Sequence, residues 1–177
     1  GSRPNSAHEA LAELQRSLGS ETVRLVTQNV DDLLERAGAD DVVHLHGDLR
    51  RAVCCRCGAE WSIGYASFSA GTPCPECGCS DRTKPGVVFF GEHAPEYARF
   101  YEGELGALSQ GDVFLVIGTS GTVVPTHQLA ASLRAEGVTT VLVDPDPPME
   151  VEQAYEFIFP CSATAGVPDA IDAIRRG

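Results

Sequence analysis

The sequence predicts an α/β domain with a doubly wound parallel sheet, interrupted by a small cysteine-rich module. Short apolar runs alternate along the chain with segments of helical periodicity, which is the pattern of a sheet covered by helices on both faces. The runs 113–117 (VFLVI) and 138–143 (VTTVLV) lack the apolar–polar alternation of a half-exposed strand. Residues 50–84 break the pattern because they are rich in cysteine and glycine and short of aliphatic periodicity.

Spacing and end signals place the helices. In the first helix Ala7, Leu11 and Leu14 recur at helical spacing after a Pro-Asn-Ser start signal. Gly38 and Gly137 each follow a periodic segment, as is typical of helix C-termini. The expected helices span residues 7–18, 31–37, 95–109, 128–136 and 169–175.

Runs of β-branched and aliphatic residues place the strands. The run 23–27 (VRLVT) ends in the polar pair Gln28-Asn29, and the run 42–45 (VVHL) leads into His46. The other expected strands span residues 87–90, 113–117, 138–143 and 156–159. Strands that alternate with helices in this way favour parallel pairing.

Length and composition limit the possible classes of protein. The 177 residues and 43% hydrophobic content predict one ordinary globular domain with a small insertion. A formal charge of -12 argues against broad binding to nucleic acid or an anionic membrane. An acidic surface would suit a basic partner such as a lysine-rich peptide, although solubility explains the charge as well. Because no apolar run is long enough to span a bilayer and no export signal is seen, we expect a cytoplasmic protein.

Four of the seven cysteines form two Cys-x-x-Cys pairs, Cys54/Cys57 and Cys74/Cys77. Two intervening residues let both sulfurs of a pair face one ion, and the glycine after each pair allows a tight turn. Four thiolates in a tetrahedron make a closed structural zinc site with no position for water. A segment this poor in apolar residues needs such a metal to fold. We therefore expect structural zinc, with free thiols or redox-active dithiols as alternatives.

Three cysteines lie outside these pairs. Cys55 and Cys79 would allow a shifted register, and we choose the pairs that end in Cys-Gly. Cys161 stands alone near the C-terminus, where a small packed residue is expected rather than a nucleophile.

Three polar loops follow predicted strands, at the sheet edge where open α/β proteins bind ligands. Residues 27–32 (TQNVDD) suit a ribose hydroxyl or a carboxamide, and equally the capping of the next helix. Residues 118–121 (GTSG) are small enough for backbone N–H groups to approach a phosphate, although this signal is weak alone. His44 and His46 share one face of a strand. His46, beside Gly47, is the better candidate for a general base, and His44 is expected to be structural.

Together these motifs resemble the sirtuin family of NAD-dependent protein deacylases. The two Cys-x-x-Cys pairs and the segments TQNVDDLLERAG, HLHGDL, KPGVVFFGE and VFLVIGTSGTVV occur in the order and approximate spacing of that family, and RPNSAHEALAELQ resembles its preceding helix. The resemblance covers essentially the whole chain. It implies a Rossmann-like NAD-binding domain at residues 1–49 and 85–177 and a zinc-ribbon module at residues 50–84.

The resemblance also implies a reaction. In sirtuins the acyl-lysine oxygen attacks C1′ of the nicotinamide ribose and nicotinamide leaves. A histidine then deprotonates a ribose hydroxyl, and the products are free lysine and O-acyl-ADP-ribose. His46 would be this general base. The implied cofactors are NAD and a structural Zn²⁺, and the implied partners are acyl-lysine protein substrates.

The matched motifs imply the other site residues. The expected cofactor contacts are Gln28, Asn29, Asp31, Gly118, Thr119, Ser120, Asp144 and Cys161. The expected substrate strand contains Val87, Val88, Phe89, Phe90, Gly91 and Glu92, whose backbone would pair with the peptide while side chains form an apolar lysine tunnel. Two positions depart from the family pattern. Asp144 stands where Asn is common, and the glycine usual near Cys161 is missing.

One family segment has no counterpart in these 177 residues. Sirtuins begin with a strand, a Gly-Ala-Gly-Ile-Ser type loop and a Thr-Phe-Arg segment, which hold the pyrophosphate and close over the cofactor. The first strand is central in the Rossmann order, so a slot between two apolar strands is expected here. The chain alone is accordingly expected to show little or no deacylase activity. The alternative functions are a non-catalytic docking module and a redox dithiol protein.

Overall fold

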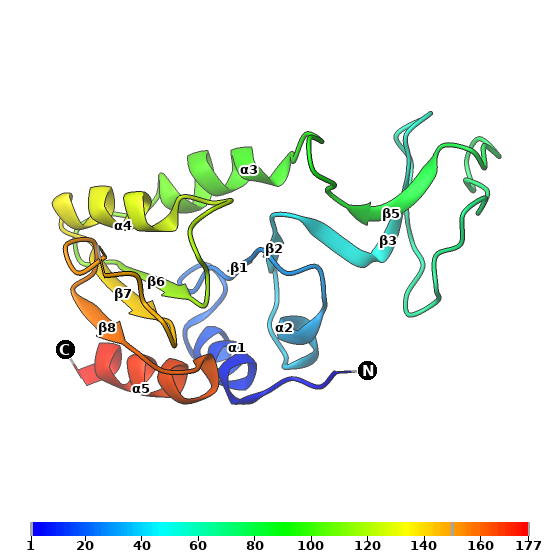
Figure 1. Ribbon diagram of the computed structural model, residues 1–177. Coiled ribbons are helices and arrows are strands. Elements are labelled where there is room, and N and C mark those ends of the chain that lie inside the picture. The colour runs from blue at the N-terminus through cyan, green and yellow to red at the C-terminus, as the bar shows by residue number, and fades with distance from the viewer. Residues whose placement is uncertain (1, 150, 177) are drawn as a thin grey trace.

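A computed structural model describes residues 2–149 and 151–176 of the chain (Figure 1). The helices are α1 (Ser6–Leu18), α2 (Leu33–Arg36), α3 (Glu96–Ala98), the π-helix η1 (Arg99–Leu105), α4 (Thr126–Ala135) and α5 (Ala163–Arg176). The strands are β1 (Val26–Thr27), β2 (Val43–His44), β3 (Gly47–Cys54), β4 (Glu60–Ser62), β5 (Thr83–Val87), β6 (Val113–Ile117), β7 (Thr139–Val143) and β8 (Phe157–Phe159).

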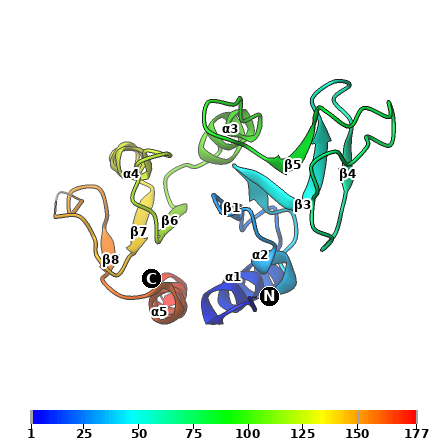
Figure 2. The same ribbon diagram turned by 45° about the vertical axis from the view of Figure 1, so that its right-hand side comes forward.

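The strands form separate parallel and antiparallel sheets. β6, β7 and β8 make a parallel sheet in which Leu115 lies opposite Val141 and Val141 opposite Phe157. β1 and β2 make a second parallel pair, and the antiparallel sheet has the order β4-β3-β5. Among the described residues β1 and β6 are not hydrogen-bonded to each other, and Figure 2 shows the two parallel sheets apart.

β7 is the centre of the α/β core. Val141 and Val143 pack with Val167 of α5 on one face of the sheet. Leu142, one residue out of phase, packs with Ala130 of α4 on the other face. Figure 1 shows α1 and α5 below the β6–β7–β8 sheet and α4 above it. The predicted burial of both sheet faces is therefore confirmed.

Several expected elements are wrong in their extent. β5 spans Thr83–Val87 rather than residues 87–90, because its pairing with β3 overrides the weak strand propensity of its Lys-Pro-Gly run. After β5 the chain turns, with the Glu92 N–H donating to the Phe89 carbonyl at 3.0 Å. The helix expected at residues 95–109 is a short α3 followed by η1.

α5 begins at Ala163, earlier than the sequence predicts. Gly166 and Pro168 lower helix propensity, but packing decides the outcome. A Cβ on Gly166 would lie 2.6 Å from Cγ1 of Val143, so only glycine lets α5 approach β7 this closely. Pro168 has no N–H for the carbonyl of Thr164, and that carbonyl instead accepts from the Ser6 hydroxyl of α1 at 2.7 Å.

No helix in the described ranges combines the length and apolar character that crossing a bilayer requires.

Candidate functional site

The Cys-x-x-Cys pairs meet at one point beyond the end of β3. The sulfur atoms of Cys54, Cys57, Cys74 and Cys77 all lie within 4.8 Å of one another. The Cys54–Cys77 and Cys57–Cys74 sulfur distances are 3.7 and 3.6 Å. Zn–S bonds of about 2.3 Å in a tetrahedron place the sulfurs about 3.8 Å apart. The four side chains therefore fit a structural Zn²⁺ ion.

Two glycine turns build this cluster. The N–H groups of Gly58 and Gly78 donate to the carbonyls of Cys54 and Cys74, each at 2.9 Å. Both glycines have positive φ, 76° and 69°, which a residue with a side chain adopts only with strain. The backbone N–H of Cys57 is the largest influence that lowers the pKa of the Cys54 thiol, to about 6, and so favours the thiolate.

The extra cysteines lie outside the cluster. Cys55 is exposed. Cys79 is buried, and its thiol donates to the Asp81 carboxylate at 3.0 Å. The structure thus brings together the four cysteines of the chosen register and not the shifted set.

His46 lies directly between β2 and β3, beside the loop that follows β1. Its Nδ1 is 2.8 Å from the carbonyl oxygen of Gln28, and its Nε2 is 3.0 Å from the hydroxyl of Tyr97. An Nδ1–H that donates to the carbonyl leaves Nε2 as the basic nitrogen, with the Tyr97 hydroxyl donating to it. Burial raises the pKa of Tyr97, so the hydroxyl stays protonated. Tyr97 was missed in the sequence, where nothing distinguishes it from an ordinary helical tyrosine.

Gly47 allows β3 and β5 to meet next to His46. Its φ is 83°, and a Cβ there would lie 2.0 Å from the carbonyl oxygen of Gly86. One step further, the Val88 N–H donates to the His46 carbonyl at 2.9 Å. The predicted substrate segment is thereby joined to the candidate general base through the backbone.

Gln28 connects two of the predicted loops. Its side-chain Nε2 donates to Oγ1 of Thr119 at 3.2 Å, across the division between β1 and β6. Asn29 is exposed. The exposed Asp31 accepts from the Leu33 N–H at 3.0 Å just before α2, whose N-cap residue Asp32 makes no side-chain capping hydrogen bond. The cofactor role of Asp31 stays a prediction.

Several residues predicted to contact the cofactor follow the ends of β6, β7 and β8. Gly118 has a φ of 54°, and its N–H donates to the Val143 carbonyl at 2.9 Å. The Ser120 hydroxyl lies 2.9 Å from that of Thr122. Asp144 accepts from the Asp146 N–H at 2.9 Å, and the Cys161 N–H donates to the Phe159 carbonyl at 2.9 Å. The structure places all of these at one sheet edge, as parallel strands require.

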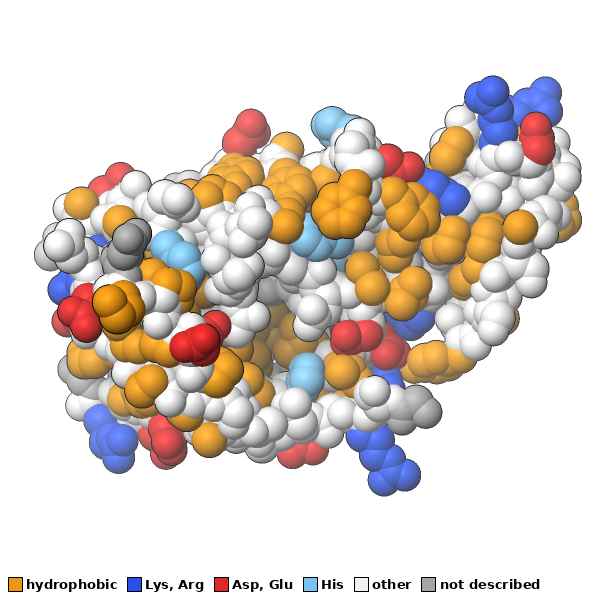
Figure 3. Space-filling view, viewed as in Figure 1, with side chains coloured by type: hydrophobic (Ala, Val, Ile, Leu, Met, Phe, Trp, Pro, Cys, Tyr) orange, Lys and Arg blue, Asp and Glu red, His pale blue; other side chains and the backbone are white. Residues whose placement is uncertain are grey.

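The segment after Val87 is more exposed than the sequence suggests. Phe89 is 50% and Phe90 103% exposed, so in the described chain these rings line no enclosed tunnel. Glu92 accepts from the Phe89 N–H at 2.9 Å and pairs with Lys84, whose ammonium lies 4.8 Å from the Phe89 ring centre. Gly91, with a φ of 84°, completes the turn. Figure 3 shows hydrophobic side chains gathered on this face, over β3 and β5.

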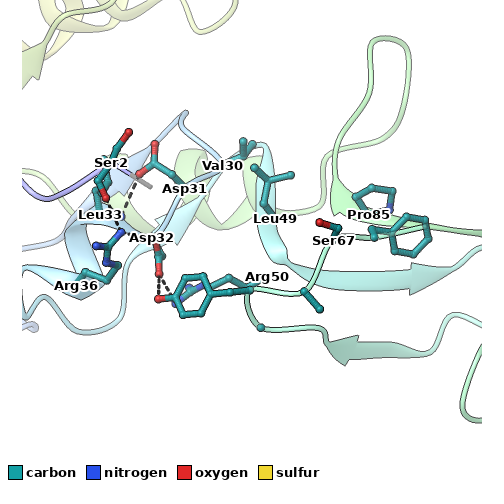
Figure 4. Close-up of a pocket in the computed structure, with 14 residues that line it drawn as sticks. Ser2, Val30, Asp31, Asp32, Leu33, Arg36, Leu49, Arg50, Ser67 and Pro85 are labelled. Carbon is teal, nitrogen blue, oxygen red and sulfur yellow. Dashed lines mark hydrogen bonds and ion pairs between the residues drawn. The ribbon is translucent and has the colours of Figure 1, made fainter. Parts of the chain in front are cut away.

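A pocket of about 460 Å³ lies between α2 and the loop at residues 64–68 (Figure 4). The Tyr65 hydroxyl donates to the buried Asp32 at 2.6 Å. Arg50 lies 3.8 Å from Asp32, 3.0 Å from Glu35 and 2.6 Å from Asp48. These contacts hold the cysteine-rich segment against the loop that contains Asn29 and Asp31. They were not predicted, because Tyr65 and Asp32 are 33 residues apart and match no motif.

The Sir2 family model matches residues 1–125. The chain belongs to the Sir2 family. An NAD-dependent protein deacylase of Campylobacter jejuni is 45% identical over 129 residues, which are 73% of this chain and 52% of the relative. An NAD-dependent protein deacylase of Thermus thermophilus is 44% identical over 147 residues, 82% of this chain and 56% of the relative. The resemblance to sirtuins inferred from the motifs is therefore confirmed.

A solved Sir2 homologue in complex with NAD has the same fold. The TM-score is 0.79 at 32% identity, over 98% of this chain and 66% of that one. This Sir2 chain thus spans between about half and two thirds of the length of the relatives it matches. The Rossmann-like fold is established by this likeness, and the role of each site residue stays a prediction.

Proposed function

We propose that this Sir2 chain carries part of the machinery for NAD-dependent removal of acyl groups from protein lysines. One observation carries the proposal: Gln28 contacts both His46, through its carbonyl at 2.8 Å, and Thr119, through its amide at 3.2 Å. Gln28 therefore connects three motifs that are separate in the sequence: its own loop, the His46 motif and the loop that contains Thr119. The relatives named NAD-dependent protein deacylase support the same reaction.

The residues fit distinct parts of NAD. Gln28 and Asn29 would contact the nicotinamide ribose, and the Asn29 amide with the Asp31 carboxylate would bind the two ends of the carboxamide. The other proposed cofactor contacts are Gly118, Thr119, Ser120, Asp144 and Cys161. NAD, when bound, supplies the ribose carbon that accepts the acyl oxygen and nicotinamide as the leaving group. His46 would take a ribose hydroxyl proton at Nε2, in place of the Tyr97 hydroxyl.

An acyl-lysine peptide is the proposed substrate. The segment from Val87 to Glu92 would bind it as an added strand, with Val88, Phe89 and Phe90 supplying apolar contact around the lysine. We propose two parts: an NAD-binding domain formed by residues 1–49 and 85–177, and a zinc-ribbon module formed by residues 50–84. β3 crosses the first boundary between them and β5 crosses the second. Zinc would stabilise the smaller part and take no part in the reaction. Its thiolates favour a reducing compartment such as the cytoplasm.

The test is an assay with NAD and an acetyl-lysine peptide that measures nicotinamide and O-acyl-ADP-ribose. We expect little turnover from the chain alone. Fusion to the N-terminal segment of the Campylobacter jejuni relative should raise the turnover, and His46→Ala should reduce it by about 10²–10⁴-fold. A docking module predicts no NAD-dependent turnover from the fusion, and that outcome would reject the proposal.

A further inference from the structure

His44 and His46 each contact a carbonyl of the same loop. The His46 Nδ1 lies 2.8 Å from the carbonyl oxygen of Gln28, and the His44 Nδ1 lies 3.3 Å from that of Asn29. On its other side the His44 Nε2 lies 2.8 Å from Oε1 of Glu35 in α2. The His44 side chain is only 12% exposed, and of its two contacts the one with Glu35 is part-buried while the one with Asn29 lies at the surface. His44 therefore bridges α2 and the loop proposed to bind nicotinamide.

Both partners of the His44 ring are hydrogen-bond acceptors. A neutral imidazole has one N–H and can donate to only one of them, whereas the imidazolium donates to both. A protonated Glu35 could donate to a neutral ring instead. Arg50 argues against this, because its Nη2 lies 3.0 Å from the same Oε1 and favours the carboxylate. The presence of an acceptor at each ring nitrogen thus suits a doubly protonated His44.

The charges around the ring agree with this state. Glu35 faces it from α2, and its Oε2 is buried without a hydrogen-bond partner among the described residues. Asp48 and Arg50 face it from β3, paired with each other at 2.6 Å. The net charge of these three side chains is negative.

We propose that His44 is a positioning residue, whose doubly protonated ring holds the Asn29 carbonyl and with it the loop from Gln28 to Asp31. The inference rests on the proposed function, because that loop would contact the nicotinamide ribose and carboxamide. As pH rises and the ring loses a proton, Glu35 keeps the remaining N–H because the carboxylate is the stronger acceptor. The Asn29 contact is then lost, and NAD affinity falls.

Ring NMR of the ligand-free chain tests the protonation state without reference to function. We expect both His44 nitrogens to be protonated at acidic pH while Glu35 is ionised. The Val30 amide, which shares a peptide unit with the Asn29 carbonyl, should shift in the same titration step. His44→Gln and Glu35→Gln should remove that step, and the exposed His93→Gln should keep it. The proposal would be overturned if the His44 ring carried a single proton over the whole pH range. It would also be overturned if the Val30 amide did not shift when His44 titrates.

NAD binding, measured by calorimetry on either side of this step, tests the consequence. The unmodified chain should bind NAD about fivefold more weakly at the higher pH, because the loss of one hydrogen bond reduces the binding free energy by about that factor in affinity. His44→Gln should bind weakly at both pH values. Glu35→Gln should bind well at both, because a neutral His44 can accept from the new amide and still donate to Asn29. Melting temperatures check that each variant folds.

The outcomes separate the two proposals. If Glu35→Gln kept the fivefold pH effect, the positioning role of His44 would be wrong and the proposed function would stand. If the unmodified chain and its N-terminal fusion both failed to bind NAD, the proposed function would be wrong, and NMR would still decide the state of His44.

Discussion

The cysteine-rich segment and the β6–β7–β8 sheet differ in what stabilises them. In the sheet, Leu142 is 0% exposed and helices cover both faces. In the segment from Cys54 to Cys79, the buried cluster consists of Cys54, Cys74 and Cys79, with Ala59 and Trp61 packed against it. The first region folds by burying apolar area, and the second has too little of it to do the same.

Because the two regions are stabilised differently, ligand spacing and apolar patterning differ in how reliably they predict structure. A metal cluster depends on a few residues at fixed spacing, so motif and structure agree residue by residue. An apolar core depends on many interchangeable residues, so its elements are predictable but their ends shift. The contact between the cysteine-rich segment and the loop before α2, at Tyr65 and Asp32, belongs to neither pattern.

The largest expected effect comes from Cys54→Ser. Losing one thiolate should release zinc and unfold the segment, because metal binding supplies about 10–16 kcal/mol in comparable small sites. Zinc content and hydrogen exchange would show loss of protection confined to this segment. Cys55→Ser is the matched control and should keep the metal. Equal zinc loss in both variants would mean that the register is wrong.

Leu142→Ala should act on the other region. Removing a fully buried side chain should lower the free energy of unfolding by about 2–5 kcal/mol, measured by urea denaturation, while zinc is retained. Leu18→Ala, at a position 53% exposed, should change it by less than about 0.5 kcal/mol. Zinc release by the core variant would show that the regions do not fold independently.

Gly47→Ala tests the close approach of β3 and β5. Backbone strain at positive φ costs about 1–3 kcal/mol, and the 2.0 Å contact with Gly86 adds to it. Gly64→Ala is the control, because Gly64 has a φ of 55° and open space around its Cβ position. Gly47→Ala should have the lower free energy of unfolding, and its difference from Gly64→Ala should equal the cost of the contact with Gly86. Equal values would contradict the described strand pairing.

The smallest effect is expected from Tyr65→Phe. Loss of the 2.6 Å hydrogen bond to Asp32 should lower the stability only slightly, because Tyr65 is 79% exposed, and should speed hydrogen exchange in residues 64–68, with zinc unchanged. Ser67→Ala, at an exposed neighbour, should leave the exchange rates as they are. If Tyr65→Phe left the exchange rates unchanged as well, the contact would not hold the cysteine-rich segment against the loop before α2.

Much of the candidate site was predictable, for reasons that differ from residue to residue. Cys54, Cys57, Cys74 and Cys77 follow from spacing, because two intervening residues suffice to aim both sulfurs at one ion. The strand run VFLVI and the loop after it follow from apolar composition. Tyr97 beside His46 was not predictable, because the two are 51 residues apart and meet only through packing.

By itself the sequence determined the α/β class, the metal ligands, the family and the prominence of His46, since these rest on local spacing and residue chemistry. Only the tertiary structure decided the end of β5, the early start of α5 and the contacts of the His44 ring. β5 ends where its pairing with β3 ends, and α5 extends because Gly166 lets it approach β7. His44 looked like a structural residue until the fold placed acceptors at both of its nitrogens, since hydrogen-bond partners distant in sequence are chosen by packing.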